Sequence, residues 1–218
     1  LLNRKNADGQ LKQLENILDL AGTAGYKILN AKVISHGSSQ SFSQTITIDA
    51  GSNAGIKKNM TVLSQYGLAG LVKDVYPNSA LIQLASDPAF KVGARIAGTQ
   101  QIGILSGRGN RSASLQLLDN STTVKVGDVL LARGSVANFP FVPGVPLGYV
   151  SQVDNSAGAV AQTATIRYYT NFSTLGIVAV VVSGPKSNPG DSLVPRKPQV
   201  TPIPTVTVTV TPSPTANN

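Results

Sequence analysis

The alternation of hydrophobic and polar residues divides the chain into a helical start, a long β region and a tail. Near the N-terminus, hydrophobic residues recur at helical spacing: Leu11, Leu14, Leu18 and Ala21. Gly22 and Gly25 follow and favour the end of a helix. The pattern predicts a helix within residues 1–30. It fits either the last turns of a coiled coil, with these residues as a dimer seam, or an amphipathic helix packed on the body.

Residues 31–184 show the two-residue alternation that is typical of β-strands. The clearest example is Thr-Ile-Thr-Ile-Asp at residues 45–49. Turn residues, mainly Gly, Pro, Asn and Asp, separate such segments at short intervals. About a dozen short strands with no helical spacing between them predict a β-sandwich or a β-barrel rather than βαβ units.

A weak internal repeat divides this β region into two related units. Residues 56–63 resemble residues 124–131, and each segment precedes a similar Gly-hydrophobic-Val piece. The last predicted strand, near residues 177–182, can close the second unit or return to the first. The tail, residues 185–218, holds eight of the chain's 13 prolines and is expected to be extended and disordered.

Composition and charge exclude several classes of function. The chain has no Cys and one His, which rules out disulfide frameworks, iron–sulfur clusters, thiolate zinc sites and multi-histidine metal sites. The net charge of +8 is spread along the chain rather than gathered on one segment. We therefore expect no metal, no cofactor and no nucleic-acid partner. The same charge fits a mild attraction to anionic lipid or anionic cell-wall polymer.

Two segments imitate catalytic motifs. Residues 190–193, Gly-Asp-Ser-Leu, match the nucleophile block of a lipase class, but they lie in the proline-rich tail. The only histidine, His36, lies upstream in a polar loop. We therefore predict that the protein is not an enzyme. Two alternatives stay open: a secreted hydrolase of trypsin-like fold and, less favoured, a β-barrel nucleic-acid-binding module.

Several segments together, in order along residues 11–184, resemble MreC, the bacterial rod shape-determining protein family. They follow the leucine-spaced helix as residues 31–34, 46–52, 55–62, 67–72, 79–84, 103–107, 126–130 and 139–150. The chain departs from the family where Phe139-Pro140 is separated from Gly144 by two additional residues. It also has Ala50 where the family usually has Lys, and Ala132-Arg133-Gly134 where the family often has Thr-Ser-Gly.

The resemblance implies a mainly β fold of two small six-stranded barrels, a trypsin-like double barrel without a catalytic triad, preceded by a helix or coiled-coil stub. We expect the stub at residues 1–30, the first barrel at 31–97, the second at 98–184 and the tail at 185–218. It also implies an anchored protein on the outer face of the cytoplasmic membrane, periplasmic or wall-facing. Because the chain begins at Leu1 rather than Met, we expect the anchoring helix to lie upstream.

The function implied by the resemblance is a non-catalytic scaffold of the elongation complex, which organises lateral peptidoglycan synthesis and cell shape. Implied partners are a second copy of the chain, a penicillin-binding transpeptidase, and MreB, MreD and RodA. An apolar loop and a turn supply our candidate partner contacts: Phe139, Phe141, Val142, Leu147, Tyr66 and Leu68. For each of these taken alone, packing in the core is the competing interpretation.

Overall fold

The structure is a computed structural model of the 218-residue chain, and it describes all residues except 1, 38–42, 100, 119–123, 155–161 and 196–218. One α-helix, α1 (Leu2–Ala24), precedes the strands of the described chain. These strands are β1 (Lys27–His36), β2 (Thr45–Ile48), β3 (Thr61–Ser64), β4 (Gly67–Val75), β5 (Ala80–Leu84), β6 (Lys91–Ile96), β7 (Ile102–Gly107), β8 (Ser112–Leu117), β9 (Val129–Ala132), β10 (Pro146–Asp154), β11 (Thr163–Tyr168) and β12 (Ile177–Ser183). Short 3-10 turns lie at η1 (Ser52–Ala54), η2 (Val136–Asn138) and η3 (Phe172–Thr174).

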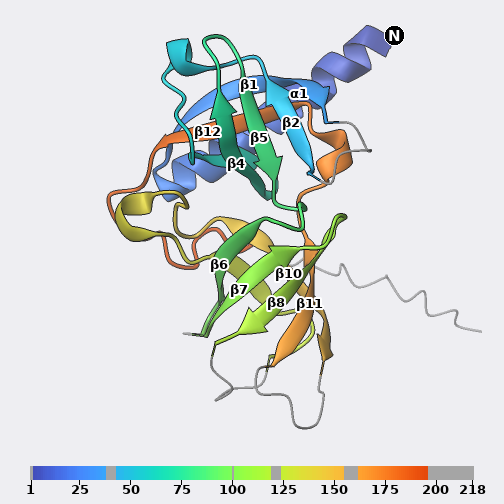
Figure 1. The fold of residues 1–218 in the computed structure, drawn as a ribbon, viewed down its shortest axis with the longest axis vertical. Helices are drawn as coiled ribbons and strands as arrows, with labels where there is room; N and C mark the ends of the chain where they lie inside the picture. The colour runs from blue at the N-terminus through green and yellow to red at the C-terminus, as the bar shows by residue number, and fades with distance from the viewer. Residues whose placement is uncertain (1, 38–42, 100, 119–123, 155–161, 196–218) are drawn as a thin grey trace, which may run out of the picture.

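The strands form two closed antiparallel barrels, one above the other in Figure 1. The first barrel has the strand order β1-β12-β3-β4-β5-β2, and the second has β10-β11-β8-β7-β6-β9. In several strands alternate side chains fill the barrel interior, as in β5, where Ala80, Ile82 and Leu84 are buried between half-buried neighbours. The fold class predicted from the sequence is therefore confirmed, and of the two β architectures the chain adopts the barrel.

The structure decides the barrel of one strand that the sequence left open and corrects that of another. β12 returns to the first barrel, where it pairs with β1 and β3. β6, which we had placed in the first domain, pairs with β7 and β9 in the second barrel. The predicted boundary at residue 97 is therefore wrong, and the chain crosses between barrels after Leu84. A two-residue period shows that Val92, Ala94 and Ile96 face a core, but it does not show which core they face.

The N-terminal helix packs on the first barrel and ends earlier than the predicted stub. Gly25, with φ of +71°, terminates α1, and the Tyr26 N–H donates to the Ala21 carbonyl at 2.9 Å. β1 then begins at Lys27, inside the range expected for the stub. The side chains of Ile17, Ala21 and Ala24 are buried against the body. In the described chain, no helix is both long and apolar enough to cross a membrane.

The segment after β12, residues 184–195, packs on the body and is called here the C-terminal strap. Leu193 is only 8% exposed. The Asp191 carboxylate accepts hydrogen bonds from Arg95 Nη1 at 2.5 Å and from the Gly98 N–H at 2.8 Å. The expectation of a disordered tail from residue 185 is therefore wrong for the strap, because these contacts compensate for its poor hydrophobic content. Residues 196–218 lie outside the described residues.

Candidate functional site

The β9–β10 loop (residues 133–145) of the second barrel exposes two apolar side chains. Val136 is 93% exposed and Phe139 is 51% exposed, and both belong to the turn around η2. Exposed apolar side chains that lie together on a loop are typical of a protein-interaction surface. We call this pair the apolar loop tip.

The backbone of the loop tip is held in an unusual conformation by hydrogen bonds. Ala137 and Asn138 have φ of 56° and 61°, a left-handed conformation that L side chains rarely adopt. The Ser135 N–H donates to the Phe141 carbonyl at 2.9 Å, and Asn138 Nδ2 donates to the Pro185 carbonyl at 3.1 Å. The strap therefore supports the loop, and the tip is presented by a fixed backbone.

The far side of the same loop is bonded to the first barrel. Thr61 Oγ1 donates to the Pro140 carbonyl at 2.7 Å and accepts from the Val142 N–H at 3.2 Å. The buried Tyr26 hydroxyl donates to the Pro143 carbonyl at 2.6 Å, and burial raises the pKa of this hydroxyl, which keeps it protonated. The loop thus connects the two barrels while its tip faces solvent.

The predicted contact residues separate into an exposed pair and a buried group. Phe139 and Tyr66 are exposed and stay candidates. The others are buried core residues, none more than 8% exposed: Phe141, Val142, Leu147 and Leu68. Phe141, for example, packs edge-on against Phe90 with ring centroids 5.7 Å apart. Sequence reasoning missed Val136, which lies outside the Phe-Pro motif that drew attention to the loop.

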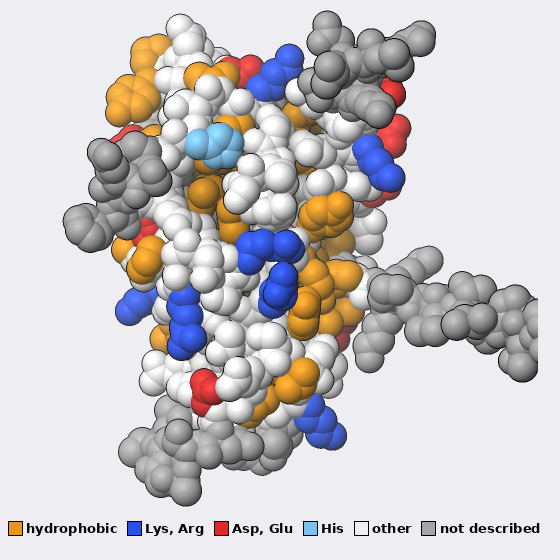
Figure 2. Space-filling view, turned by 90° about the vertical axis from the view of Figure 1, so that its right-hand side faces the viewer, with side chains coloured by type: hydrophobic (Ala, Val, Ile, Leu, Met, Phe, Trp, Pro, Cys, Tyr) orange, Lys and Arg blue, Asp and Glu red, His pale blue; other side chains and the backbone are white. Residues whose placement is uncertain are grey.

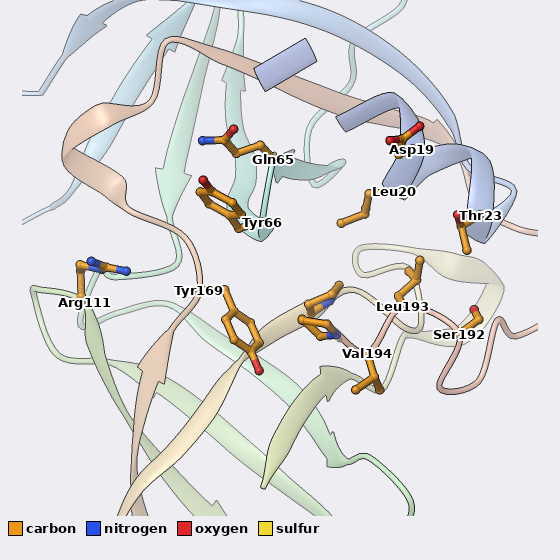
Figure 3. Close-up of a pocket in the computed structure, with 12 residues that line it drawn as sticks. Asp19, Leu20, Thr23, Gln65, Tyr66, Arg111, Tyr169, Ser192, Leu193 and Val194 are labelled. Carbon is orange, nitrogen blue, oxygen red and sulfur yellow. The ribbon is translucent and has the colours of Figure 1, made fainter. Parts of the chain in front are cut away.

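Tyr66 lies at the rim of a hollow of about 520 Å³ between the two barrels, called here the tyrosine hollow. Its other walls come from α1, from Tyr169 just after β11, and from the strap. Figure 3 shows Tyr66 and Tyr169 toward one side and Leu20 and Leu193 toward the other. A largely apolar hollow of this size is large enough to accept side chains of a partner.

The helix presents a second exposed apolar surface. Leu11 and Leu18 are exposed, and Leu14 beside them is half-buried. Ala21, the fourth predicted seam residue, is buried on the body-facing side, so it is not part of an exposed seam. Ile17, the most buried residue of that side, was not singled out from the sequence. The structure therefore confirms that α1 packs on the body as an amphipathic helix, and the coiled-coil seam stays a prediction for its exposed face.

The two segments that resemble catalytic motifs, around His36 and Ser192, do not form one site. His36 lines a polar hollow of about 450 Å³ with Gln44, Ser86 and others, whereas Ser192 lines the tyrosine hollow. In the described part of the chain, no group of three His, Asp or Glu side chains is placed to hold a metal ion.

The buried Asp87 carboxylate, next to the polar hollow, has a structural explanation. It accepts hydrogen bonds from the Gln44 and Ala89 N–H groups, each at 2.7 Å. Burial alone would raise the pKa of Asp87, but these hydrogen bonds lower it below its usual value. The carboxylate therefore stays charged and fixes the corner where the chain passes between barrels.

In the part of the chain that the structure describes, the fold is a double antiparallel β-barrel with exposed apolar side chains on the β9–β10 loop and on α1. The family model "Rod shape-determining protein MreC, barrel core" matches residues 33–182. The chain therefore belongs to the MreC family. It is 30% identical over 176 residues to the cell shape-determining protein MreC of Listeria monocytogenes, covering 78% of this chain and 59% of that protein.

Solved structures agree with this assignment. A structure titled MreC superimposes with a TM-score of 0.70 and 26% identity, covering 80% of this chain and 98% of the other. A complex between the penicillin-binding protein PBP2 and MreC from Helicobacter pylori has a TM-score of 0.56 and 15% identity, covering 72% and 99%. At that identity the likeness shows the fold alone. Since the chain spans 59% of the Listeria relative, it matches only part of such proteins.

Proposed function

We propose that this chain is a non-catalytic scaffold of the bacterial elongation complex, which organises lateral peptidoglycan synthesis and so determines cell shape. Membership of the MreC family supports this role, since the family model is named for rod shape determination. In this proposal the barrels perform no chemistry. They hold other proteins in fixed positions through their exposed surfaces.

The partner that we propose for the apolar loop tip is a penicillin-binding transpeptidase. The Helicobacter pylori MreC was solved in complex with PBP2, which provides a precedent for such a partner. The observation that carries the proposal is the loop itself, because Val136 and Phe139 are exposed on a backbone that hydrogen bonds hold in place. A preorganised apolar contact loses little conformational entropy on binding. The tyrosine hollow, with Tyr66 at its rim, offers a second place of contact.

Self-association is proposed to use the exposed face of α1. Leu11, Leu14 and Leu18 recur at the three- and four-residue spacing of a coiled-coil seam, on a side of the helix that the first barrel leaves open. We further propose that the protein is anchored to the cytoplasmic membrane, faces the wall, and works with MreB, MreD and RodA. The family relationship supports these last assignments.

The scaffold proposal is tested by replacing the gene in a rod-shaped host with a variant that lacks the apolar loop tip, Val136→Ser with Phe139→Ser. The matched control is Val126→Ser, which removes a similarly exposed valine elsewhere on the second barrel. We expect rounded cells and dispersed wall labelling for the double variant and normal rods for the control.

Equal protein levels of the two variants are confirmed first, so that loss of protein is not mistaken for loss of contact. Rods with normal wall labelling in cells that carry only the double variant would contradict the docking role of the loop. Rods in cells depleted of the whole protein would contradict the scaffold role itself.

A further inference from the structure

Two arginines line one hollow on the second barrel, away from the apolar loop tip. Arg111 immediately precedes β8, and Arg167 lies on β11 directly opposite Ser112 in the antiparallel ladder. The Tyr168 N–H donates to the Arg111 carbonyl at 2.9 Å, so the two arginines lie one register step apart on adjacent strands. With Asn110, Ser112 and Ser151 they line a hollow of about 380 Å³, called here the arginine hollow.

No carboxylate neutralises this pair within the described residues. The ion pairs found there are Lys58–Asp74 and Arg95–Asp191, and neither involves Arg111 or Arg167. Figure 2 shows that basic side chains on this face of the molecule lie among polar and apolar ones, two of them next to each other at mid-height. Both arginines are exposed, so the core does not require them. A negatively charged ligand in this hollow would meet two positive charges that no described carboxylate neutralises.

Among the other polar groups of the hollow, Asn110 offers N–H donors to such a ligand. Asn110 Oδ1 accepts from the Ser112 N–H at 2.7 Å and from the Ser112 hydroxyl, which directs the Asn110 amide N–H groups away from Ser112. Ser151 Oγ donates to the Thr165 carbonyl at 3.0 Å. The donors that remain are two guanidinium groups and one amide. Guanidinium groups match the paired oxygens of phosphate and hold them with charge-assisted hydrogen bonds.

We propose that the arginine hollow is a binding site for a phosphate group, carried as a phosphomonoester or phosphodiester. Three sets of N–H donors around one hollow suit a tetrahedral oxyanion, which offers oxygens in several directions. Arg111 also lines the tyrosine hollow, so the bound phosphate has an apolar wall within reach. The phosphate can belong to a soluble polymer or to a lipid headgroup, and the chemistry of the hollow is the same for both.

The first experiment measures binding of glycerol phosphate to the full chain by NMR chemical-shift titration. The test variant is Arg111→Gln with Arg167→Gln, and the matched control is Arg133→Gln, an exposed arginine of the same barrel that lines neither hollow. We expect at least tenfold weaker binding for the double variant, on the order expected for loss of two charge-assisted contacts, and no change for the control. Absence of binding by the wild-type chain at ~50 mM ligand and low salt, or equal weakening in the control, overturns the proposal.

A second experiment separates the two sources of phosphate. The wild-type chain and the same variants are tested against poly(glycerol phosphate) and against vesicles that contain phosphatidylglycerol, with phosphatidylcholine vesicles as the blank. If the arginines are needed for binding to the polymer and the vesicles do not bind, the ligand is a polymer. If they are needed for binding to the vesicles and the polymer does not bind, the ligand is a lipid. If the double variant still binds both the polymer and the phosphatidylglycerol vesicles as the wild type does, the binding is a general attraction to a protein of charge +8, and the proposed site is wrong.

Discussion

The two barrels differ in how the chain builds them. The second barrel uses β6 to β11, one uninterrupted stretch from Lys91 to Tyr168. The first barrel uses β1 to β5 and is closed only by β12, which returns from beyond the second barrel. It also carries α1 on its outside. The strands of the first barrel therefore come from both ends of the described chain, whereas the strands of the second follow one another in sequence.

The two barrels also differ in the surfaces that they carry. The barrel that needs both halves of the chain carries α1, whose exposed leucines we propose for self-association. The self-contained barrel carries the apolar loop tip and the arginine hollow, which we propose for a protein partner and for phosphate. We expect damage to the first barrel to leave the strands of the second barrel folded, while the β9–β10 loop loses its hydrogen bonds with Thr61. The reverse does not follow, because β12 is reached only through the second barrel.

The largest expected effect comes from a charge placed in β12. Val180 is fully buried between Leu29 of β1 and Val62 of β3, so Val180→Asp buries an unpaired carboxylate. We expect a loss of about 4 kcal/mol or more in the free energy of unfolding of the first barrel. Hydrogen exchange should show lost protection in β1 to β5 and retained protection in β6 to β11.

Val182→Asp is the control for this prediction, because Val182 lies on the same strand and is 37% exposed. It should cost much less than Val180→Asp. Equal loss of protection in both barrels of the Val180→Asp protein would show that they unfold as one unit. The proposed difference between the barrels would then be wrong.

The next effect concerns the two faces of α1. Ile17→Ala removes the buried anchor of the helix and should cost about 2 to 5 kcal/mol of unfolding free energy. Leu18→Ala, on the exposed face, should change stability by less than about 0.5 kcal/mol and instead weaken self-association. Urea denaturation and sedimentation velocity measure the two properties. Unchanged self-association in a Leu11→Ala, Leu18→Ala protein would count against the proposed seam.

A smaller effect is expected at the junction between the barrels. The buried Tyr168 hydroxyl donates to the Ala85 carbonyl at 2.7 Å, just after β5. Tyr168→Phe leaves that carbonyl without its donor and should cost about 1 to 3 kcal/mol by urea denaturation. The control is Tyr149→Phe, at a half-buried tyrosine of β10, which should leave the free energy of unfolding nearly unchanged. A neutral Tyr168→Phe would mean that this bond does not couple the barrels.

The smallest effect is the pH dependence of the strap. Hydrogen bonding from Arg95 is the main cause that lowers the pKa of Asp191, so the charged form stabilises the folded state. That contribution is present above the unfolded pKa of about 3.9 and is lost as the pH falls through the lower folded value. Because the pair is partly exposed, Asp191→Asn should cost about 0.2 to 1 kcal/mol at pH 7. The difference in free energy of unfolding between Asp191→Asn and wild type should vanish near pH 2. A difference that does not change with pH would contradict a stabilising role of the charged Asp191.

Much of the fold could be predicted because it depends on local patterns. The two-residue alternation located the strands, and the leucine spacing located the helix. The barrel membership of β6 and β12 could not be predicted, since it depends on contacts between residues far apart in the chain. The order of the strap could not be predicted either. It depends on the hydrogen bond from Arg95 to Asp191, which lie far apart in the chain, rather than on the composition of the strap itself.

The candidate site was predicted only in part for a related reason. Phe139 and Phe141 are chemically identical and two residues apart, yet one is exposed and the other packs on Phe90. Between Val136 and Phe139 the backbone is left-handed at Ala137 and Asn138. Asn tolerates this conformation but Ala rarely adopts it, so the turn that exposes Val136 was not visible in the sequence.

The most direct test of the central claim is the affinity of this chain for the penicillin-binding transpeptidase of the same organism, measured by biolayer interferometry. The wild-type chain, the Val136→Ser, Phe139→Ser double variant and the Val126→Ser control are compared at equal fold stability. We expect the Val126→Ser control to bind with the affinity of the wild type. The double variant should bind at least tenfold more weakly, a difference on the order of 1.4 kcal/mol. Equal affinity for all three proteins, or no binding by the wild type, would contradict it.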